Sequence, residues 1–554
     1  MAKAKNILFI MFDQLRWDYL SCAGHPHLHT PHIDALAAEG VRFTRAYVQA
    51  PVCGASRMSF YTGRYVHSHG STWNRVPLQV GEHTMGDHLR DAGMDCWLVG
   101  KTHMVADEEG MKRLGVPRDS IIGVRTEQCG FDVWERDDGM RPEGPAGLYD
   151  EHGAEKYNDW LRAKGYEGDN PWHDFANAGR DENGQVASGW YLKNARMPAH
   201  IAEEDSETPY MTTRAMEFME QAGDTPWCCH LSYIKPHWPY IAPPPYNDMY
   251  GPDQVIPVNR SDAEWEDMHP VYRSYAENGV GRSFAQDHVR AEVIPSYMGL
   301  IKQCDDQMGR LFAWLKDTGR WDDTMIVLTS DHGDYLGDHW LGEKELFHDC
   351  SVKVPLIIRD PSTQADSTRG TVCDALVEAI DLAPTFLEVA GGEPRPHILE
   401  GRSILPFLHG NAPDEWREAV ICESEYGIFP AAKEFSRNVK DPRQFMVRSD
   451  RWKFIHAEGF RPMLFDLQND PDELTDLGTD PDYADIRAQH FDMLNVWARR
   501  LSQRTTMSPA DIETERDRST AKGILLGAWD ENGGPPGVAE MYRPRPAPKG
   551  PHDG

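Results

Sequence analysis

Acidic, amide and imidazole side chains follow two short apolar segments of the chain. Asp13 and Gln14 come directly after Asn6–Phe12, and Asp331 and His332 come after a second such segment. Ligands of open α/β sheets bind at the carboxyl ends of the strands, so side chains at these two positions can share one ligand. Carboxylate, amide and imidazole groups bind divalent cations. Either pair alone is typical of a helix cap or a turn, but together they predict a metal site.

Basic side chains follow two further apolar segments. Lys101 and His103 come after Cys96–Val99, and His237 follows the other segment. Cations beside a metal are suited to an anion bound to that metal. Lys344 could add another cation if its loop folds back; otherwise it is a solvated surface lysine. These positions predict an anion-binding pocket.

Cys53 precedes an expected helix that ends at Gly63. The N-terminus of a helix favours anions because its N–H groups are free and the helix dipole is positive there. Arg57, one turn further on, is expected to point the same way. The residues alone leave two interpretations open, a low-pKa thiolate nucleophile and a buried structural cysteine.

The elements that must position these residues alternate in type. Helical spacing is clear from Pro31, with Thr30 as N-cap, to Gly40, and again from Tyr297 to Lys316. The predicted strands are Asn6–Phe12, Cys96–Val99, Trp227–Ile234, Met325–Thr329 and Val354–Ile358. Buried strands alternating with amphipathic helices predict an α/β domain, with a largely parallel central sheet flanked by helices.

The rest of the chain suggests further divisions. Residues 107–205 are expected to be loop-like, and four short strands within 419–467 predict a small antiparallel sheet. The last 24 residues contain six Pro and five Gly, which predicts an extended or disordered arm. We therefore predict a catalytic α/β domain at 1–410, a C-terminal subdomain with the small sheet at 411–520 and a Pro/Gly-rich arm at 521–554.

The composition limits the classes of protein that this chain can be. Its 554 residues carry 57 Lys and Arg against 88 Asp and Glu, a formal net charge of −31, which argues against nucleic-acid coating or an anionic membrane partner. No apolar run is long enough to span a membrane, and the first apolar stretch ends at Asp13 without a cleavage site. The ten cysteines lack paired spacing, which is typical of a reducing compartment. We expect a cytoplasmic protein with a local cationic pocket.

The segment around Cys53 resembles the signature of the sulfatases of the alkaline phosphatase superfamily, including their phosphonate monoester hydrolase relatives. Cys53 to Arg57 reads CGASR against the family's C-x-P-S-R, with Ala55 in place of Pro, and Thr62 to Arg64 matches the T-G-R that ends the signature. Further matches occur in family order over most of the first 360 residues: Asn6–Arg16, Thr30–Ala46, Gly100–His103, Lys235–Pro239, Ser330–Lys344 and Val354–Ile358. The resemblance implies an alkaline phosphatase-like fold and conversion of the cysteine to formylglycine.

The resemblance also implies a ligand set for one divalent metal. Asp13, Gln14, Asp331 and His332 would ligate it, and the modified Cys53 would supply an oxygen. His332 stands where many calcium-dependent sulfatases have Asn. Imidazole suits manganese better than calcium, which prefers oxygen, so both metals are candidates.

Further roles follow from the same resemblance. Arg57 would hold the formylglycine hydrate, while Lys101, His103, His237 and Lys344 would bind the sulfuryl oxygens and assist proton transfer. The implied partners are a small anionic ester, a formylglycine-generating enzyme and a second copy of the chain in a homo-oligomer.

Two substrate classes stay open within this resemblance. Sulfate monoesters, phosphonate monoesters and phosphodiesters are all monoanions, so charge does not separate them. The Lys101 and His103 pair resembles the sulfatase arrangement, whereas Asn74 matches a polar pocket residue of the phosphonate-hydrolase branch. We expect an arylsulfatase-like enzyme for aryl or alkyl sulfates. The alternatives are a phosphonate monoester or phosphodiester hydrolase and, more distantly, an inactive anion-binding homologue.

Overall fold

The computed structural model describes residues 4–139, 156–427, 442–516, 529–530, 537 and 539–552. The chain divides into two compact units. The first comprises Met1–Pro394 and Leu399–Arg500, and the second comprises Arg395–Ile398 and Leu501–Gly554. The second unit contains α18 (Pro509–Glu515) and a 3-10 turn, η12 (Ala539–Tyr542). The sheets described below belong to the first unit.

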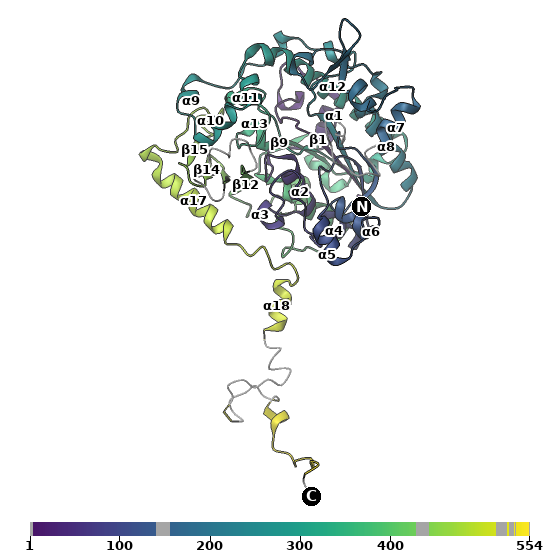
Figure 1. Ribbon diagram of the computed structural model, residues 1–554. Helices are drawn as coiled ribbons and strands as arrows, with labels where there is room; N and C mark the ends of the chain where they lie inside the picture. The colour runs from purple at the N-terminus through teal and green to yellow at the C-terminus, as the bar shows by residue number, and fades with distance from the viewer. Residues whose placement is uncertain are drawn as a thin grey trace. The chain divides into compact units, whose positions relative to one another are not determined.

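A large mixed sheet forms the centre of the first unit (Figure 1). Its strands are β1 (Asn6–Asp13), β2 (Val41–Tyr47), β3 (Asp95–Gly100), β4 (Asp132–Arg136), β7 (Trp227–Pro236), β8 (Thr324–Ser330), β9 (Lys353–Arg359), β10 (Thr371–Cys373) and β11 (Val377–Glu378). They run in the order β10-β2-β9-β8-β1-β7-β3-β4, and β11 pairs with β2. Pairing is parallel from β8 to β4, while β9 runs antiparallel to both β8 and β2. The predicted α/β fold with a largely parallel sheet is confirmed.

The central strand β1 is buried on both faces, as its nearly continuous apolar run requires. Successive side chains of a strand point to opposite faces. Phe9 and Met11 accordingly pack into one hydrophobic core, and Ile10 and Phe12 pack into the other. Each face of the sheet therefore has its own core.

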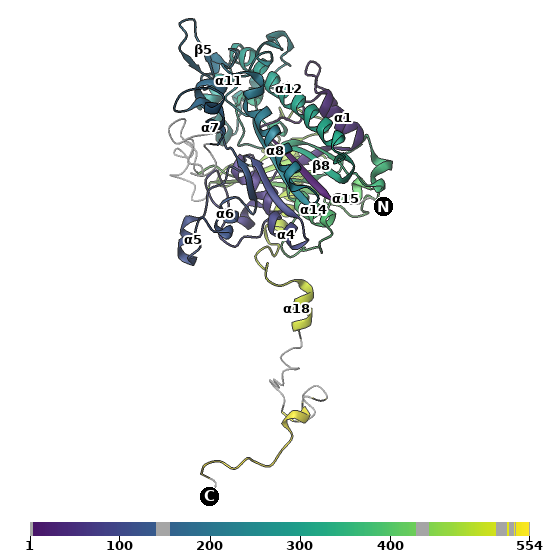
Figure 2. The same ribbon diagram turned by 90° about the vertical axis from the view of Figure 1, so that its right-hand side faces the viewer.

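Different helices cover the two faces. The core that contains Ile10 includes α1 (Pro31–Glu39), α8 (Glu207–Ala222) and α12 (Asp287–Asp317), and α1 and α12 lie side by side in both views (Figures 1 and 2). The core that contains Phe9 includes α2 (Cys53–Thr62), α4 (Met85–Asp91) and α14 (Leu382–Ala390). The helix α12 begins ten residues before the predicted start at Tyr297, because Pro295 is accommodated inside it.

Residues 107–205 contain more regular structure than expected. Besides β4, the described residues form α5 (Glu108–Leu114), α6 (Ile121–Glu127), α7 (Lys156–Ala163) and the hairpin β5 (Ala178–Arg180) with β6 (Val186–Ser188). The loop-like prediction was wrong for these segments, because each is too short to show a clear period. The strand β4 has the sequence DVWER, which is too polar to stand out as a strand. It can carry polar residues because it is the last strand of the sheet.

A second, smaller sheet lies nearer the C-terminus. It consists of β12 (Ala419–Glu425), β13 (Arg443–Ser449), β14 (Trp452–Ala457) and β15 (Met463–Asp466), all antiparallel in that order, with α17 (Ala484–Ala498) packed against it. The predicted antiparallel C-terminal sheet is confirmed. The boundaries 1–410, 411–520 and 521–554 stay predictions, and much of the Pro/Gly-rich arm lies outside the described residues.

The remaining described helices are short connectors: α3 (Val66–His69), α9 (Asp262–Glu266), α10 (Pro270–Ala276), α11 (Gly279–Phe284), α13 (Asp349–Val352) and α15 (Leu405–Leu408). All ten cysteines are free thiols, which agrees with their unpaired spacing. Each helix in the described part of the chain is too short or too polar to cross a membrane.

Candidate active site

Four parallel strands deliver polar side chains to the same edge of the sheet. The strands β8, β1, β7 and β3 are consecutive neighbours. Asp13 ends β1, Asp331 follows β8, His237 follows β7 and Lys101 follows β3. The convergence at the carboxyl ends that the sequence predicted is therefore present.

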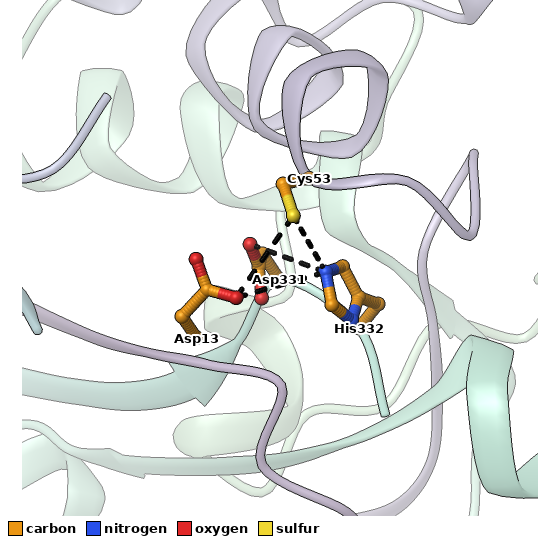
Figure 3. Close-up of side chains that lie close together, drawn as sticks. All are labelled: Asp13, Cys53, Asp331 and His332. Carbon is orange, nitrogen blue, oxygen red and sulfur yellow. Dashed lines mark hydrogen bonds and ion pairs between the residues drawn. The ribbon is translucent and has the colours of Figure 1, made fainter. Parts of the chain in front are cut away.

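A cluster suited to a divalent cation lies at this edge. Asp13, Cys53, Asp331 and His332 are buried and offer ligand atoms that all lie within 4.8 Å of one another (Figure 3). Cys53 Sγ is 3.0 Å from His332 Nε2 and 3.9 Å from Asp13 Oδ1. Two carboxylates and an imidazole form a donor set that such cations bind. The residues present therefore fit a metal ion, and we call these four the metal-type cluster.

The protonation of His332 agrees with a ligand role. Its Nδ1 lies 2.9 Å from the Gly333 carbonyl oxygen, to which it donates, so the Nε2 lone pair faces the cluster. Burial lowers the pKa of His332 in spite of the neighbouring Asp331, which keeps the ring neutral.

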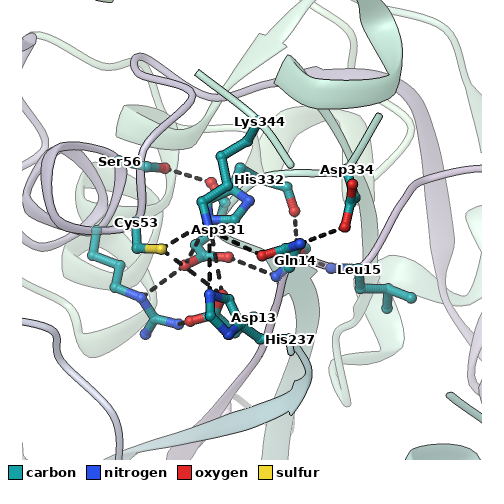
Figure 4. Close-up of polar contacts among 12 residues, drawn as sticks. Asp13, Gln14, Leu15, Cys53, Ser56, His237, Asp331, His332, Asp334 and Lys344 are labelled. Carbon is teal, nitrogen blue, oxygen red and sulfur yellow. Dashed lines mark hydrogen bonds and ion pairs between the residues drawn. The ribbon is translucent and has the colours of Figure 1, made fainter. Parts of the chain in front are cut away.

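Gln14 presents its amide oxygen to the site because its amide nitrogen is held elsewhere. The nitrogen donates to Asp334 and to the hydroxyl of Tyr240, the latter at 3.0 Å. The oxygen accepts from Lys344 Nζ at 2.9 Å (Figure 4). Gln14 also donates its backbone N–H to Asp331 Oδ1 at 3.1 Å, which ties the ends of β1 and β8 together.

Buried cations keep Asp13 ionised. Arg57 donates from Nη2 to Asp13 Oδ2 at 3.0 Å and from Nε to Asp331 Oδ2 at 2.8 Å, and Lys101 Nζ lies 2.5 Å from Asp13 Oδ2. Burial alone would raise the pKa of Asp13, but Lys101, His237 and Arg57 together hold it well below its ordinary value. Asp13 is therefore an anionic ligand even though it is fully buried.

The helix α2 places Cys53 and Arg57 one turn apart, as predicted. Cys53 is its first residue, Gly63 ends it with φ +65°, and every residue between them is buried. Asn74 Oδ1 accepts from the Gly54 N–H at 2.8 Å, so the predicted pocket residue lies against the start of this helix. Burial, together with Asp13, raises the pKa of the Cys53 thiol to about 12. These surroundings disfavour the low-pKa thiolate interpretation.

His237 and Lys344 form a pair beside the cluster. Lys344 Nζ lies 3.2 Å from His237 Nε2, and that nitrogen lies 3.8 Å from Asp13 Oδ1. His237 Nδ1 donates to the Trp238 carbonyl oxygen at 2.7 Å, which leaves Nε2 as the acceptor. Burial holds the pKa of His237 well below its ordinary value, so the ring is neutral. The loop of Lys344 folds back into the site, which excludes a solvated surface lysine.

His103 makes no hydrogen bond or ion pair with the metal-type cluster among the described residues. Its backbone N–H donates to Asp138 Oδ1 at 2.8 Å, and its φ of +56° is unusual for a residue with a side chain. Burial, and then Lys101, hold its pKa well below the ordinary value. Its Nδ1 is buried and unpaired within the described part of the chain, so it can bond a ligand.

Comparison with known proteins explains this arrangement. The Sulfatase family model matches residues 5–392, which include every residue of the metal-type cluster. The chain belongs to the sulfatase family. A second model, N-sulphoglucosamine sulphohydrolase, C-terminal, matches residues 337–499.

The relatives of this sulfatase include both an arylsulfatase and a phosphonate monoester hydrolase. The chain is 31% identical over 541 residues to the multifunctional alkaline phosphatase superfamily protein PehA of Trinickia caryophylli, covering 94% of this chain and 98% of that protein. It is 28% identical over 499 residues to an arylsulfatase of Clostridium perfringens, covering 86% and 91%. The structure of the phosphonate monoester hydrolase SpPMH from Silicibacter pomeroyi superposes with a TM-score of 0.77 at 30% identity, covering 89% and 95%.

Three further residues of the sulfatase site were not predicted. Asp334 orients Gln14, and Tyr240 donates to Asp334 at 2.5 Å. Ser232 accepts from Arg57 Nη1 at 2.7 Å. Only Asp334 has a signal in the sequence, because it stands three residues after Asp331 in the same polar run.

Proposed function

We propose that this sulfatase hydrolyses sulfate monoesters, with formylglycine made from Cys53 and one divalent metal as its cofactors. The observation that carries the proposal is the position of Cys53 at the start of the buried helix α2, with Asp13, Asp331 and His332 around it. The similarity to an arylsulfatase supports the substrate class.

Formation of formylglycine is an oxidation of the Cys53 side chain. The methylene carbon with its thiol, together with one water, becomes an aldehyde and hydrogen sulfide, and two protons and two electrons are released. A formylglycine-generating enzyme would deliver the electrons to an external oxidant such as dioxygen. Hydration of the aldehyde would supply one hydroxyl that attacks sulfur and a second whose deprotonation regenerates the aldehyde and releases sulfate.

Asp13, Gln14, Asp331 and His332 would hold the metal, either calcium or manganese. When bound, it would polarise the ester and lower the pKa of a nearby hydroxyl group. Arg57 keeps the two carboxylates in place, because it bonds both of them from one side.

The remaining cations would bind and protonate the ester. Lys101, at the end of β3, and Lys344, in the loop between β8 and β9, would bond the non-bridging oxygens. His237 would be the general acid: once its Nε2, which accepts from Lys344, is protonated, it would donate that proton to the departing alcohol oxygen. His103 Nδ1, which has no partner among the described residues, would make a further bond to the substrate.

Phosphonate monoester or phosphodiester hydrolysis is the second candidate. The superposition on SpPMH and the similarity to PehA favour it, as does Asn74 beside the first turn of α2. All these substrates are monoanions, so the two candidates use the same cationic residues.

A rate comparison separates the two candidates. The metal-loaded, modified enzyme is assayed with an aryl sulfate, and with a phosphonate monoester and a phosphodiester of the same phenol. We expect kcat/KM to be highest for the sulfate. A higher value for either phosphorus ester would overturn the sulfatase assignment in favour of the second candidate.

A further inference from the structure

A second group of metal-ligating side chains lies in the first unit, outside the active site. Glu264 belongs to α9, His339 to a 3-10 turn, η8 (Asp338–Trp340), and His348 directly precedes α13. One ligand atom from each residue lies within 4.8 Å of the other two. The three side chains line a cavity of about 220 Å³. We call them the Glu264 cluster.

Both imidazoles of the Glu264 cluster are held through Nδ1. His339 Nδ1 lies 2.6 Å from Glu264 Oε1, and His348 Nδ1 lies 3.0 Å from the Tyr335 hydroxyl. The Tyr335 hydroxyl fixes His348 in the way that is typical of a metal-ligating histidine, with the other ring nitrogen left for the ion. Within the described ranges His348 Nε2 makes no hydrogen bond, and Glu264 Oε2 is buried without a partner. His339 Nδ1 already faces the Glu264 carboxylate, so the described residues offer one donor atom from each of the three side chains.

The two rings are buried and stacked. His339 and His348 are 2% and 3% exposed, and their ring centroids are 3.6 Å apart with 2° between the planes. Two protonated rings would repel at this distance. At this distance at least one of the two rings is in the neutral, ligating form.

The charge around the cavity favours a cation. Glu473 and Asp476 also line it, but Lys453 and Arg461 pair with them. The Glu264 carboxylate has only an imidazole as its ion-pair partner among the described residues. A cation bound there would neutralise this carboxylate and bind one nitrogen of each imidazole ring.

We propose that the Glu264 cluster binds a second divalent transition-metal ion of the zinc class. Its ligands are Nδ1 of His339, Nε2 of His348 and the Glu264 carboxylate, with water completing a tetrahedral shell. The ion takes the place of the proton between His339 Nδ1 and Glu264 Oε1, and the two rings tilt out of their parallel stack so that both in-plane lone pairs reach it. Imidazole nitrogen selects zinc over calcium, which requires an all-oxygen shell.

Such an ion would fix the segment that completes the active site. His339 and His348 lie on either side of Lys344 in the chain, and Asp331 begins the same segment. The non-glycine residues of this segment with positive φ are Leu336, His339, Trp340, Glu343 and Glu345. Residues in such conformations persist only where the surrounding contacts impose them. The second metal thus has a structural role, and its existence does not depend on the proposed function.

The test uses zinc itself with the full-length chain. The parent protein is the Asp13→Asn, Asp331→Asn variant, which has lost the carboxylates of the metal-type cluster. Equilibrium dialysis followed by elemental analysis gives the zinc content, and thermal unfolding with and without zinc gives the stabilisation. We expect the parent to retain a single zinc ion and to unfold at a higher temperature with zinc.

Added substitutions in this parent locate the site. His339→Gln and, separately, Glu264→Gln are expected to weaken zinc binding by about 100-fold or more and to abolish the thermal shift. His269→Gln is the matched control, because His269 lines the same cavity but already bonds the Arg461 carbonyl oxygen and the Val271 N–H. This control is expected to bind zinc like the parent.

The Glu264→Gln variant guards against misfolding, since Glu264 is the least buried of the three ligands. A second comparison uses the chain with an intact metal-type cluster. We expect that chain to bind two zinc ions and its His339→Gln variant to bind one. A parent that unfolds cooperatively but binds no zinc, retention of zinc by His339→Gln, or equal loss in His269→Gln would overturn the proposal.

Discussion

Asp13 is the residue on which the charges of the site depend. It pairs with Arg57 and Lys101, and His237 and His332 each approach its Oδ1 to 3.8 Å. Without this carboxylate, the buried cations would repel one another across a short distance. The cations around it allow Asp13 to stay charged without solvent.

Cys53→Ala tests the nucleophile. We expect kcat/KM for an aryl sulfate to fall by a factor on the order of 10³ or more, because no other side chain can supply the modified nucleophile. Cys129→Ala is the control. The Cys129 sulfur lies 3.6 Å from the sulfur of Met58, which belongs to the same helix as Cys53, but Cys129 is not part of the metal-type cluster. Equal rates for Cys53→Ala and the unchanged enzyme would refute the assignment.

Asp334→Asn tests how Gln14 is oriented. An asparagine can donate as well as accept, so Gln14 would be free to turn its amide oxygen away from the site. We expect manganese affinity, measured by titration, to fall by about 10- to 100-fold. Asp338→Asn changes a buried carboxylate of the same segment that pairs with Arg16 instead, and we expect it to leave the affinity nearly unchanged. Equal effects of the two substitutions would contradict this role for Asp334.

Residue types next to strand ends were sufficient to predict most of the site. Asp331, His237 and Lys101 were found in this way, and the resemblance to the sulfatases supplied their roles. The contacts of Gln14 were not predictable, because its partner Tyr240 is 226 positions away and has no distinctive local pattern. The position of His103 Nδ1, which has no hydrogen-bond partner in the described part of the chain, was not predictable either, since it depends on the backbone angles of the loop.

At the scale of elements, the helix α2 positions the residues on which the proposed chemistry depends. Its first turn carries Cys53 and Arg57, and its end is fixed by Gly63 in the left-handed region. A helix stop of this kind could be read from the sequence because glycine adopts such angles freely. The start of α12 could not, since Pro295 normally signals a helix end.

Gly63→Ala tests how tightly α2 is packed. A Cβ at this position would lie 2.7 Å from Leu399 Cδ2 and 2.9 Å from Ala383 Cβ, in addition to the strain of φ +65°. Gly115→Ala has the same strain, at φ +67°, but meets nothing within 4 Å. We expect a loss of unfolding free energy of about 1 kcal/mol for Gly115→Ala and roughly 1–3 kcal/mol more for Gly63→Ala. Denaturant unfolding measures both losses. Equal losses would contradict the prediction, because they would mean that Leu399 and Ala383 move aside at no cost.

At the scale of the whole molecule, the fold concentrates positive charge in one place. The formal net charge is −31, yet Arg57, Lys101 and Lys344 are all buried at one edge of the main sheet. The acidic composition predicted that an anionic substrate would need a local cationic pocket of this kind. It could not predict that the C-terminal sheet is tied to the same unit through a buried lysine.

Lys453→Met tests that link. Lys453 on β14 is fully buried and contacts Asp349 at 2.6 Å and Glu473 at 2.5 Å. Methionine would leave the buried Glu473 without an ion-pair partner among the described residues, and Asp349 with only the longer pair to Lys353 at 3.8 Å. We therefore expect a loss of about 3–5 kcal/mol in unfolding free energy. Lys5→Met removes an exposed pair with Asp224 and is expected to cost at most about 1 kcal/mol. Similar small losses in both would contradict a structural role for the buried lysine.

The chemistry at position 53 is tested most directly by mass spectrometry. The peptide containing Cys53 is analysed from protein made in a host that also makes the formylglycine-generating enzyme, and the same preparation is assayed with an aryl sulfate. We predict an aldehyde at position 53, in a fraction that rises and falls with the specific activity. A preparation that hydrolyses the sulfate at its full rate with an unmodified thiol at position 53 would contradict the proposed mechanism.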